Sequence, residues 1–127
     1  MIVNLTDKSE ESLQAQLVRQ IRTLILYGDL EAGRQLPSIR QLAGEQRVSV
    51  VTVQRAYEAL EGLGLIHVRR GKGYFVSELS HEDRMTFSRT QLLARLVPIF
   101  RQARAEGLEA SGLQEAVRIA LEVSGRD

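Results

Sequence analysis

The chain has 127 residues, which suits one small domain with an appendage better than two domains of ordinary size. Seventeen Lys and Arg residues nearly balance sixteen Asp and Glu residues, so the net charge of +1 excludes a disordered polyelectrolyte and leaves nucleic-acid binding undecided. The absence of Cys excludes disulfides, thiolate metal sites and cysteine nucleophiles, and two His residues are too few for a histidine-built metal centre.

Neither export nor membrane insertion is predicted. The first eleven residues are polar and acidic, where a signal peptide would have an apolar run. The longest apolar stretch, Leu96–Phe100, is far shorter than the ~20 residues of a membrane-spanning helix. We therefore expect a cytoplasmic protein that has no membrane partner and needs no metal or other cofactor.

The first predicted element is an amphipathic helix whose apolar residues recur every three or four positions between Leu13 and Ile25. Ser9 and Ser12 are both suitable N-caps, and Gly28 ends the helix near Tyr27. A loop is expected over residues 30–36.

Two short helices joined by a tight turn should follow. Ser38 opens the first with a capping box in which its hydroxyl bonds the third amide of the helix and Gln41 reaches back. Ser49 caps the second, which ends at Gly62 and Gly64. In this second helix Val53 and Ala56 should face the core, which directs its remaining early residues outward.

The pattern then changes to a β-hairpin. Residues 65–69 alternate and are rich in β-branched side chains, residues 70–73 have turn chemistry, and residues 74–76 form the return strand. Tyr57 and Tyr74 are expected to pack in the core or at its rim, and His67 to be a partly exposed structural residue. Two helices joined by a tight turn and followed by a glycine-tipped hairpin predict a winged helix-turn-helix.

The remaining residues predict two further helices. Pro98 should kink the first or break it one turn upstream, Gly107 should end it, and a second capping box should place Ser111 at the start of the next. Two helices cannot enclose a core by themselves, so their apolar stripes need a partner surface. We expect that surface to be a second copy, which these residues would contact: Leu92, Leu96, Ile99, Phe100, Leu113, Val117 and Leu121.

Charge is concentrated where the winged helix would meet DNA. Between Arg34 and Val76 there are seven basic and three acidic residues, an excess of four that the near-neutral total conceals. The second helix of such a pair fits the DNA major groove, and its first residues meet the base edges. The local charge therefore favours nucleic acid as the partner.

Three stretches resemble the DNA-binding domain of the GntR family of bacterial transcription regulators: QIRTLILYGDLEAGRQLPSIRQLA, VSVVTVQRAYEALEGLGLI and RRGKGYFV. The short helical tail is similar to that of the YtrA-type subfamily. The resemblance implies a homodimer that is joined through its tail helices and represses a small operon, often one that encodes an ABC transporter.

The resemblance also implies roles for single residues. Arg40 would contact the DNA backbone or a guanine, Thr52 and Gln54 would act at the start of the recognition helix, and Gly71 would enter the minor groove. Arg55 has two interpretations, a DNA contact or an ion pair with Glu58. The full set of expected DNA-binding residues is Ser38, Arg40, Ser49, Val50, Val51, Thr52, Gln54, Arg55, Arg69, Arg70, Gly71 and Lys72.

The chain departs from the family pattern at two places. Val50 and Val51 stand where many relatives have Arg or Asn, and a valine can meet a thymine methyl but cannot donate a hydrogen-bond pair to guanine. Arg47 stands where many relatives have Gly, so the turn has to hold a non-glycine residue in an unfavourable conformation.

The sequence thus predicts a mainly α protein with a small β-hairpin. Residues 1–78 would form the winged helix-turn-helix domain and residues 79–127 the helical dimerisation tail. The expected partners are an inverted-repeat operator in double-stranded DNA and a second copy of the chain, and no chemical step is implied. The alternative is a winged-helix module that binds protein. A small-molecule effector is left open, and it would bind between subunits or between the tail and the winged helix.

Overall fold

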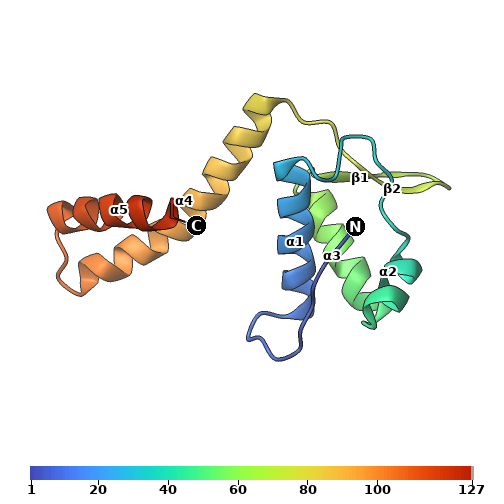
Figure 1. Cartoon of the computed structure of the whole chain (residues 1–127), viewed down its shortest axis with the longest axis horizontal. Helices are drawn as coiled ribbons and strands as arrows, with labels where there is room; N and C mark the ends of the chain where they lie inside the picture. Colours follow the sequence, from blue (N-terminus) through green and yellow to red (C-terminus); the bar gives the residue numbers. More distant parts are fainter. Residues whose placement is uncertain (127) are drawn as a thin grey trace. The chain divides into compact units, whose positions relative to one another are not determined.

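The computed structural model describes residues 1–126, which form five helices and a two-stranded antiparallel sheet (Figure 1). The chain divides into two compact units, one spanning Met1–His81 and the other beginning at Glu82. This division falls three residues beyond the predicted boundary at residue 78. Within residues 1–126, no helix combines the length and the apolar character that crossing a membrane requires.

Helix α1 (Leu13–Tyr27) has the predicted bounds, and the structure decides between its two candidate caps. The Ser12 hydroxyl accepts from the Ala15 amide at 3.1 Å, and Gly28 ends the helix in the left-handed conformation with φ of 102°. Residues before the helix lie along it because Gln16 and Gln20 hold them. The side chain of Gln16 bonds both backbone polar groups of Thr6 at 2.7–2.9 Å, and Gln20 does the same for Asn4 at 2.7 Å.

Helices α2 (Ile39–Gln46) and α3 (Val50–Gly62) follow, and α3 packs against α1, α2 and the sheet. Val53 and Ala56 are fully buried, as predicted from their spacing. The core of this unit is aliphatic except for Tyr57, Phe75 and the buried Gln16, and its largest buried residues include Leu17, Ile21, Ile25, Leu42, Leu60, Leu65, Ile66 and Val76.

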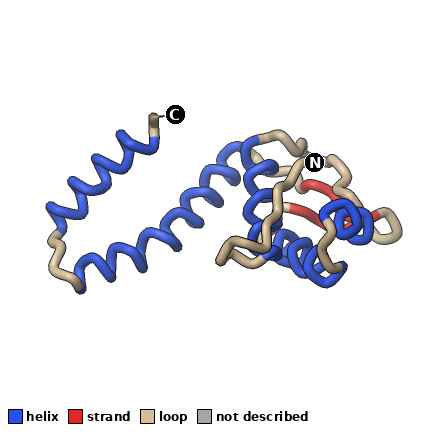
Figure 2. The backbone as a smooth tube through the Cα atoms, turned by 60° about the horizontal axis from the view of Figure 1, so that its bottom comes forward, coloured by secondary structure: helices blue, strands red, loops and turns tan. Residues whose placement is uncertain are grey.

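The predicted hairpin consists of β1 (Ile66–Arg69) and β2 (Gly73–Val76), which pair from Ile66↔Val76 to Arg69↔Gly73 (Figure 2). Residues 33–36, expected to be a loop, form an additional edge beside β2. The amides of Gly33 and Leu36 donate to the carbonyls of Val76 and Tyr74 at 2.8 and 2.9 Å, and Val76 donates to Arg34 at 2.9 Å. The predicted loop is therefore strand-like at its end.

The second unit contains most of α4 (His81–Ala105) and all of α5 (Ala110–Ser124). Of the two outcomes predicted for Pro98, the break one turn upstream is wrong, because α4 is one continuous helix that contains this residue, and the kink stays a prediction (Figure 2). A proline on a helix removes one backbone donor, and the neighbouring turns continue the helix here.

The predicted Ser111 cap is also wrong, because α5 begins at Ala110 with Glu109 at the N-cap position. Gly107, with φ of 105°, lies in the turn between α4 and α5. The Leu108 amide donates to the Ala103 carbonyl at 3.0 Å. The side chain of Leu108 then packs directly over Gly112, where an added Cβ would lie 2.6 Å from a Leu108 methyl carbon. This apolar contact starts the helix earlier and leaves Ser111 inside its first turn.

Candidate nucleic-acid interface

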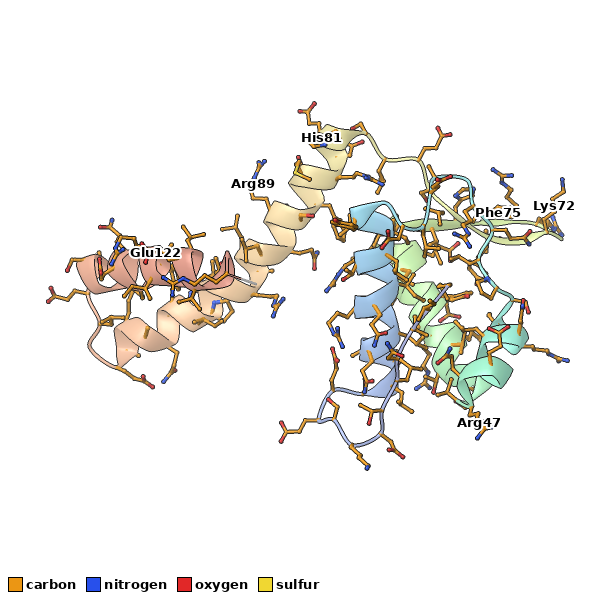
Figure 3. The ribbon with its side chains drawn as sticks, viewed as in Figure 1. Arg47, Lys72, Phe75, His81, Arg89 and Glu122 are labelled. Carbon is orange, nitrogen blue, oxygen red and sulfur yellow. The ribbon has the colours of Figure 1, made fainter. Side chains whose placement is uncertain are left out.

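The turn between α2 and α3 depends on a strained residue. Arg47 lies in the left-handed region, with φ of 56° and ψ of 45°, and it is the single non-glycine residue with positive φ within residues 1–126. The amides of Arg47 and Val48 donate to the Ala43 carbonyl, which closes the end of α2. The expected unfavourable conformation is confirmed, and it directs the chain from α2 into α3 at the turn labelled in Figure 3.

Serine hydroxyls begin both helices of the pair. Ser38 accepts from the Gln41 amide at 3.1 Å, but the reciprocal half of the predicted capping box is wrong, because the Gln41 side chain donates to Glu45 at 3.2 Å. Glu45 lies one turn further along the helix and offers a charged acceptor, which competes with the return to Ser38. Ser49 accepts from the Thr52 amide at 3.0 Å, and its hydroxyl lies 2.8 Å from that of Thr52.

The outer face of α3 combines apolar and polar side chains. Val50 and Val51 are 45% and 51% exposed, and Gln54 and Arg55 are exposed as well, whereas Thr52 is half-buried against Ser49. Gln54 donates to Glu58 at 3.2 Å, so Glu58 takes the side chain of Gln54 and forms no ion pair with Arg55. Arg55 is thus left available to a phosphate.

The wing presents its tip residues to solvent. Lys72 donates its amide to the Arg69 carbonyl at 2.9 Å, and Gly71, with φ of 74°, occupies the turn position that favours glycine. Arg70, Gly71 and Lys72 are exposed, and Figure 3 shows Lys72 at the tip of the hairpin. The side chain of Arg69 does not extend to the tip. Its guanidinium carbon lies 4.3 Å from the centre of the Phe75 ring. That contact holds the side chain on the sheet surface, so Arg69 lies behind the tip.

No sequence pattern indicated a role for Gln35, which contacts the wing from residues 33–36. Its side-chain amide donates to the Lys72 carbonyl at 2.6 Å. The run Arg34-Gln35-Leu36 is too short for an alternating pattern to indicate a strand, and the contact spans 37 residues of sequence.

The basic residues between Arg34 and Val76 are not neutralised by acidic side chains of the described structure. None of the seven basic side chains between Arg34 and Val76 forms an ion pair within residues 1–126. All seven are exposed. The same described residues hold no group of three or more His, Cys, Asp or Glu side chains that could bind a metal ion. Residues 34–76 therefore present unneutralised cations to solvent.

Tyr57 joins the recognition helix to the start of α2. Its ring is fully buried and packs edge-on against Tyr74, with 5.0 Å between ring centres, and its hydroxyl donates to the Pro37 carbonyl at 2.7 Å. The pKa of Tyr57 is raised above its ordinary value, chiefly by burial and further by the negative charges of ionised Tyr74 and Glu45. The predicted packing role of both tyrosines is confirmed.

The second unit exposes most of the apolar residues predicted for dimerisation. Leu113 is buried, Leu96 and Phe100 are half-buried, and the other four are between 38% and 69% exposed. A groove of about 390 Å³ between α4 and α5 is lined by Leu92, Leu96, Phe100, Val117 and Leu121, together with Ala116, Ala120 and Ser124. Leu113 lies in an adjoining hollow of about 300 Å³, and Ile99 lines neither.

Comparison with known proteins identifies the first unit. Residues 13–76 match the model of the gntR family of bacterial regulatory proteins, a range that contains α1, the helix-turn-helix and the wing. The HTH-type transcriptional repressor YtrA of Bacillus subtilis is 29% identical over 125 residues, which cover 98% of this chain and 96% of the relative. The similarity therefore includes the tail.

Solved structures agree with this assignment. A GntR family transcriptional regulator from Listeria monocytogenes is 26% identical, with a TM-score of 0.70, and the match covers 90% of this chain and 97% of that one. The DNA-binding domain of AraR in complex with operator ORE1 is 25% identical, with a TM-score of 0.51 and coverage of 61% and 94%. These relatives are transcription regulators and not enzymes. The chain belongs to the gntR family of bacterial regulatory proteins, and it is a winged-helix, DNA-binding transcription regulator.

Proposed function

We propose that this protein is a homodimeric repressor that reads an inverted-repeat operator with α3 in the major groove and the wing in the minor groove. The observation that carries the proposal is the row of exposed, unneutralised cations along the helix-turn-helix and wing. Phosphate contacts by such residues release counterions and supply most of the affinity. The YtrA relative, named a transcriptional repressor, supports the direction of regulation.

Individual contacts follow from the arrangement. Val50, Val51 and Gln54 would meet base edges from the first turns of α3, and Ser38, Arg40, Ser49, Thr52 and Arg55 would lie along the flanking phosphates. At the wing, Arg70, Gly71 and Lys72 would approach the minor groove. Arg69 would act from behind the tip, since it is held on Phe75. Apolar contact with thymine methyl groups is the readout that two exposed valines permit.

The tail supplies the two-fold symmetry in this proposal. The groove between α4 and α5 is apolar and open, and a second copy would cover it with the same residues from its own helices. Residues 1–78 would then be the DNA-binding domain and the remainder the dimerisation tail. The resemblance to the YtrA-type subfamily extends the proposal to control of a small operon, such as one that encodes an ABC transporter, by a protein acting in the cytoplasm.

The test begins with selection of bound duplexes from a random pool, followed by a salt titration on the selected sequence. We expect Arg70→Ala to weaken binding to every duplex and to reduce the salt dependence by about one counterion, the value for one phosphate contact. Arg40→Ala should weaken binding as well, without change in circular dichroism. Arg101→Ala, which removes the same charge from the second unit, should leave affinity unchanged.

One observation favours a second candidate. The exposed Val50 and Val51 on α3 would also suit a protein partner. A winged helix that binds protein would show a flat salt response on duplex DNA and no effect of Arg40→Ala or Arg70→Ala. Such a result would contradict the repressor proposal.

A further inference from the structure

The turn at the tip of the wing receives one hydrogen bond from a side chain outside the hairpin. Gln35 donates from its Nε2 to the Lys72 carbonyl at 2.6 Å. The amide of the same residue, Lys72, donates to the Arg69 carbonyl. Both backbone polar groups of Lys72 are thus engaged, one by the turn itself and one by a side chain from outside the hairpin.

The surrounding residues leave space for this contact. Gly73 adopts φ of 114°, and a Cβ added there would lie 3.2 Å from Nε2 of Gln35, so a side chain at this position would press on the amide. The backbone of residues 33–36 is held to β2 by three hydrogen bonds, and Gln35 pairs with Phe75. The side-chain amide of Gln35 therefore extends from a segment whose backbone is itself hydrogen-bonded to β2.

A hairpin of two four-residue strands has little stability of its own. Its tip carries Arg70, Gly71 and Lys72, and all three are exposed. The direction of the tip consequently depends on whatever holds its backbone. Within residues 1–126, Gln35 is the one side chain from outside the hairpin that bonds the backbone of this turn.

We propose that Gln35 is a positioning residue that orients the wing tip for DNA, through its hydrogen bond to the Lys72 carbonyl. This inference depends on the DNA-binding role of the wing in the proposed function. Gln35 itself need not touch DNA. It fixes the turn in advance, so that binding does not have to order the tip.

The first experiment uses Gln35→Met, which keeps the length of the side chain and removes the donor. Amide hydrogen exchange at residues 71–73 should become faster, with no change at α3 and no change in the thermal unfolding midpoint. Affinity for the selected operator should fall roughly three- to tenfold, the range set by one ordinary hydrogen bond. Gln102→Met is the matched control, since Gln102 donates to Glu106 at 2.8 Å in the second unit and should change neither quantity.

A double-mutant cycle separates positioning from a general structural effect. In a background with Arg70→Ala and Lys72→Ala, the tip of the wing has lost its two cations, so Gln35→Met should weaken binding less than twofold. An equal loss in both backgrounds would overturn the inference, because Gln35 would then act elsewhere. Unchanged affinity of Gln35→Met in the wild-type background would also overturn it. If wild-type protein binds no duplex in a salt-dependent manner, the proposed function itself has failed.

Discussion

Arg47 connects two helices in a conformation that an L-residue adopts at a cost of about 1–2 kcal/mol. We expect Arg47→Gly to raise the free energy of unfolding by about 0.5–1 kcal/mol, because glycine avoids this strain and loses part of the gain to its greater entropy when unfolded. Arg47→Ala removes the charge and keeps the strain. Urea denaturation of the two variants measures the difference, and equal stabilities would show that the turn is not strained.

Tyr57 makes stability depend on alkaline pH. Its pKa is raised in the folded protein above the value near 10 that it has when unfolded, so its contribution is complete below pH 10 and is lost as the pH rises further. Tyr57→Phe should cost about 1 kcal/mol at pH 7, because the Pro37 carbonyl loses its donor. The deficit should shrink above pH 10.

Urea unfolding of wild type and Tyr57→Phe at pH 7 and at pH 10.5 provides the measurement. Tyr27→Phe is the matched control, since the Tyr27 side chain is 83% exposed, and its stability should follow wild type at both values. A deficit for Tyr57→Phe that stays constant over this range would contradict the argument.

Interactions between residues close in the sequence could be predicted, and interactions between residues far apart in the sequence could not. Ser38 and Ser49 were recognisable as caps because a cap bonds an amide three residues away. The roles of Gln16, Gln20 and Gln35 depend on backbone groups 10, 16 and 37 residues away, which no local pattern records. Gln41 failed as half of a capping box because Glu45 is a competing acceptor.

At the scale of elements, Ser49 and Ser111 were both predicted to cap a helix, and replacing them should have different effects on stability. Ser49→Ala should lower the free energy of unfolding by about 1 kcal/mol, because the Thr52 amide loses its acceptor. Ser111→Ala should change it by a few tenths at most, since Ser111 lies inside α5 and caps nothing. Thermal or urea unfolding of the pair is sufficient, and an equal loss in both would restore Ser111 as a cap.

Element boundaries were predictable where a cap and a glycine agreed, as at α1 between Ser12 and Gly28. They were not predictable where tertiary packing determined where an element begins or ends. The contact between Leu108 and Gly112 accompanies a start of α5 at Ala110, ahead of the predicted cap Ser111. Hydrogen bonds to β2 make residues 33–36 strand-like. Pro98 shows the same limit, since its local preference is against a helix interior and the helix nevertheless continues.

For the whole molecule, the tail can be tested by truncation. A chain ending at Ser80 keeps the core of the first unit and should sediment as a monomer that has lost most of its operator affinity, because two half-sites no longer bind together. Leu121→Asp in the full chain is the finer variant, since Leu121 is 69% exposed and its replacement should not unfold the helix. A truncated chain that still sediments as a dimer would contradict the role of the tail.

The chain around residues 36–38 joins the parts that would face DNA. Leu36 bonds β2, Pro37 accepts from Tyr57 of α3, and Ser38 begins α2. The helices α2 and α3 and the wing are thus all attached to residues 36–38. A tilt of one of them would disturb the hydrogen bonds of the others. Adjustment to an imperfect half-site must then come from the duplex, so affinity should also vary with the flexibility of base steps that the protein never touches.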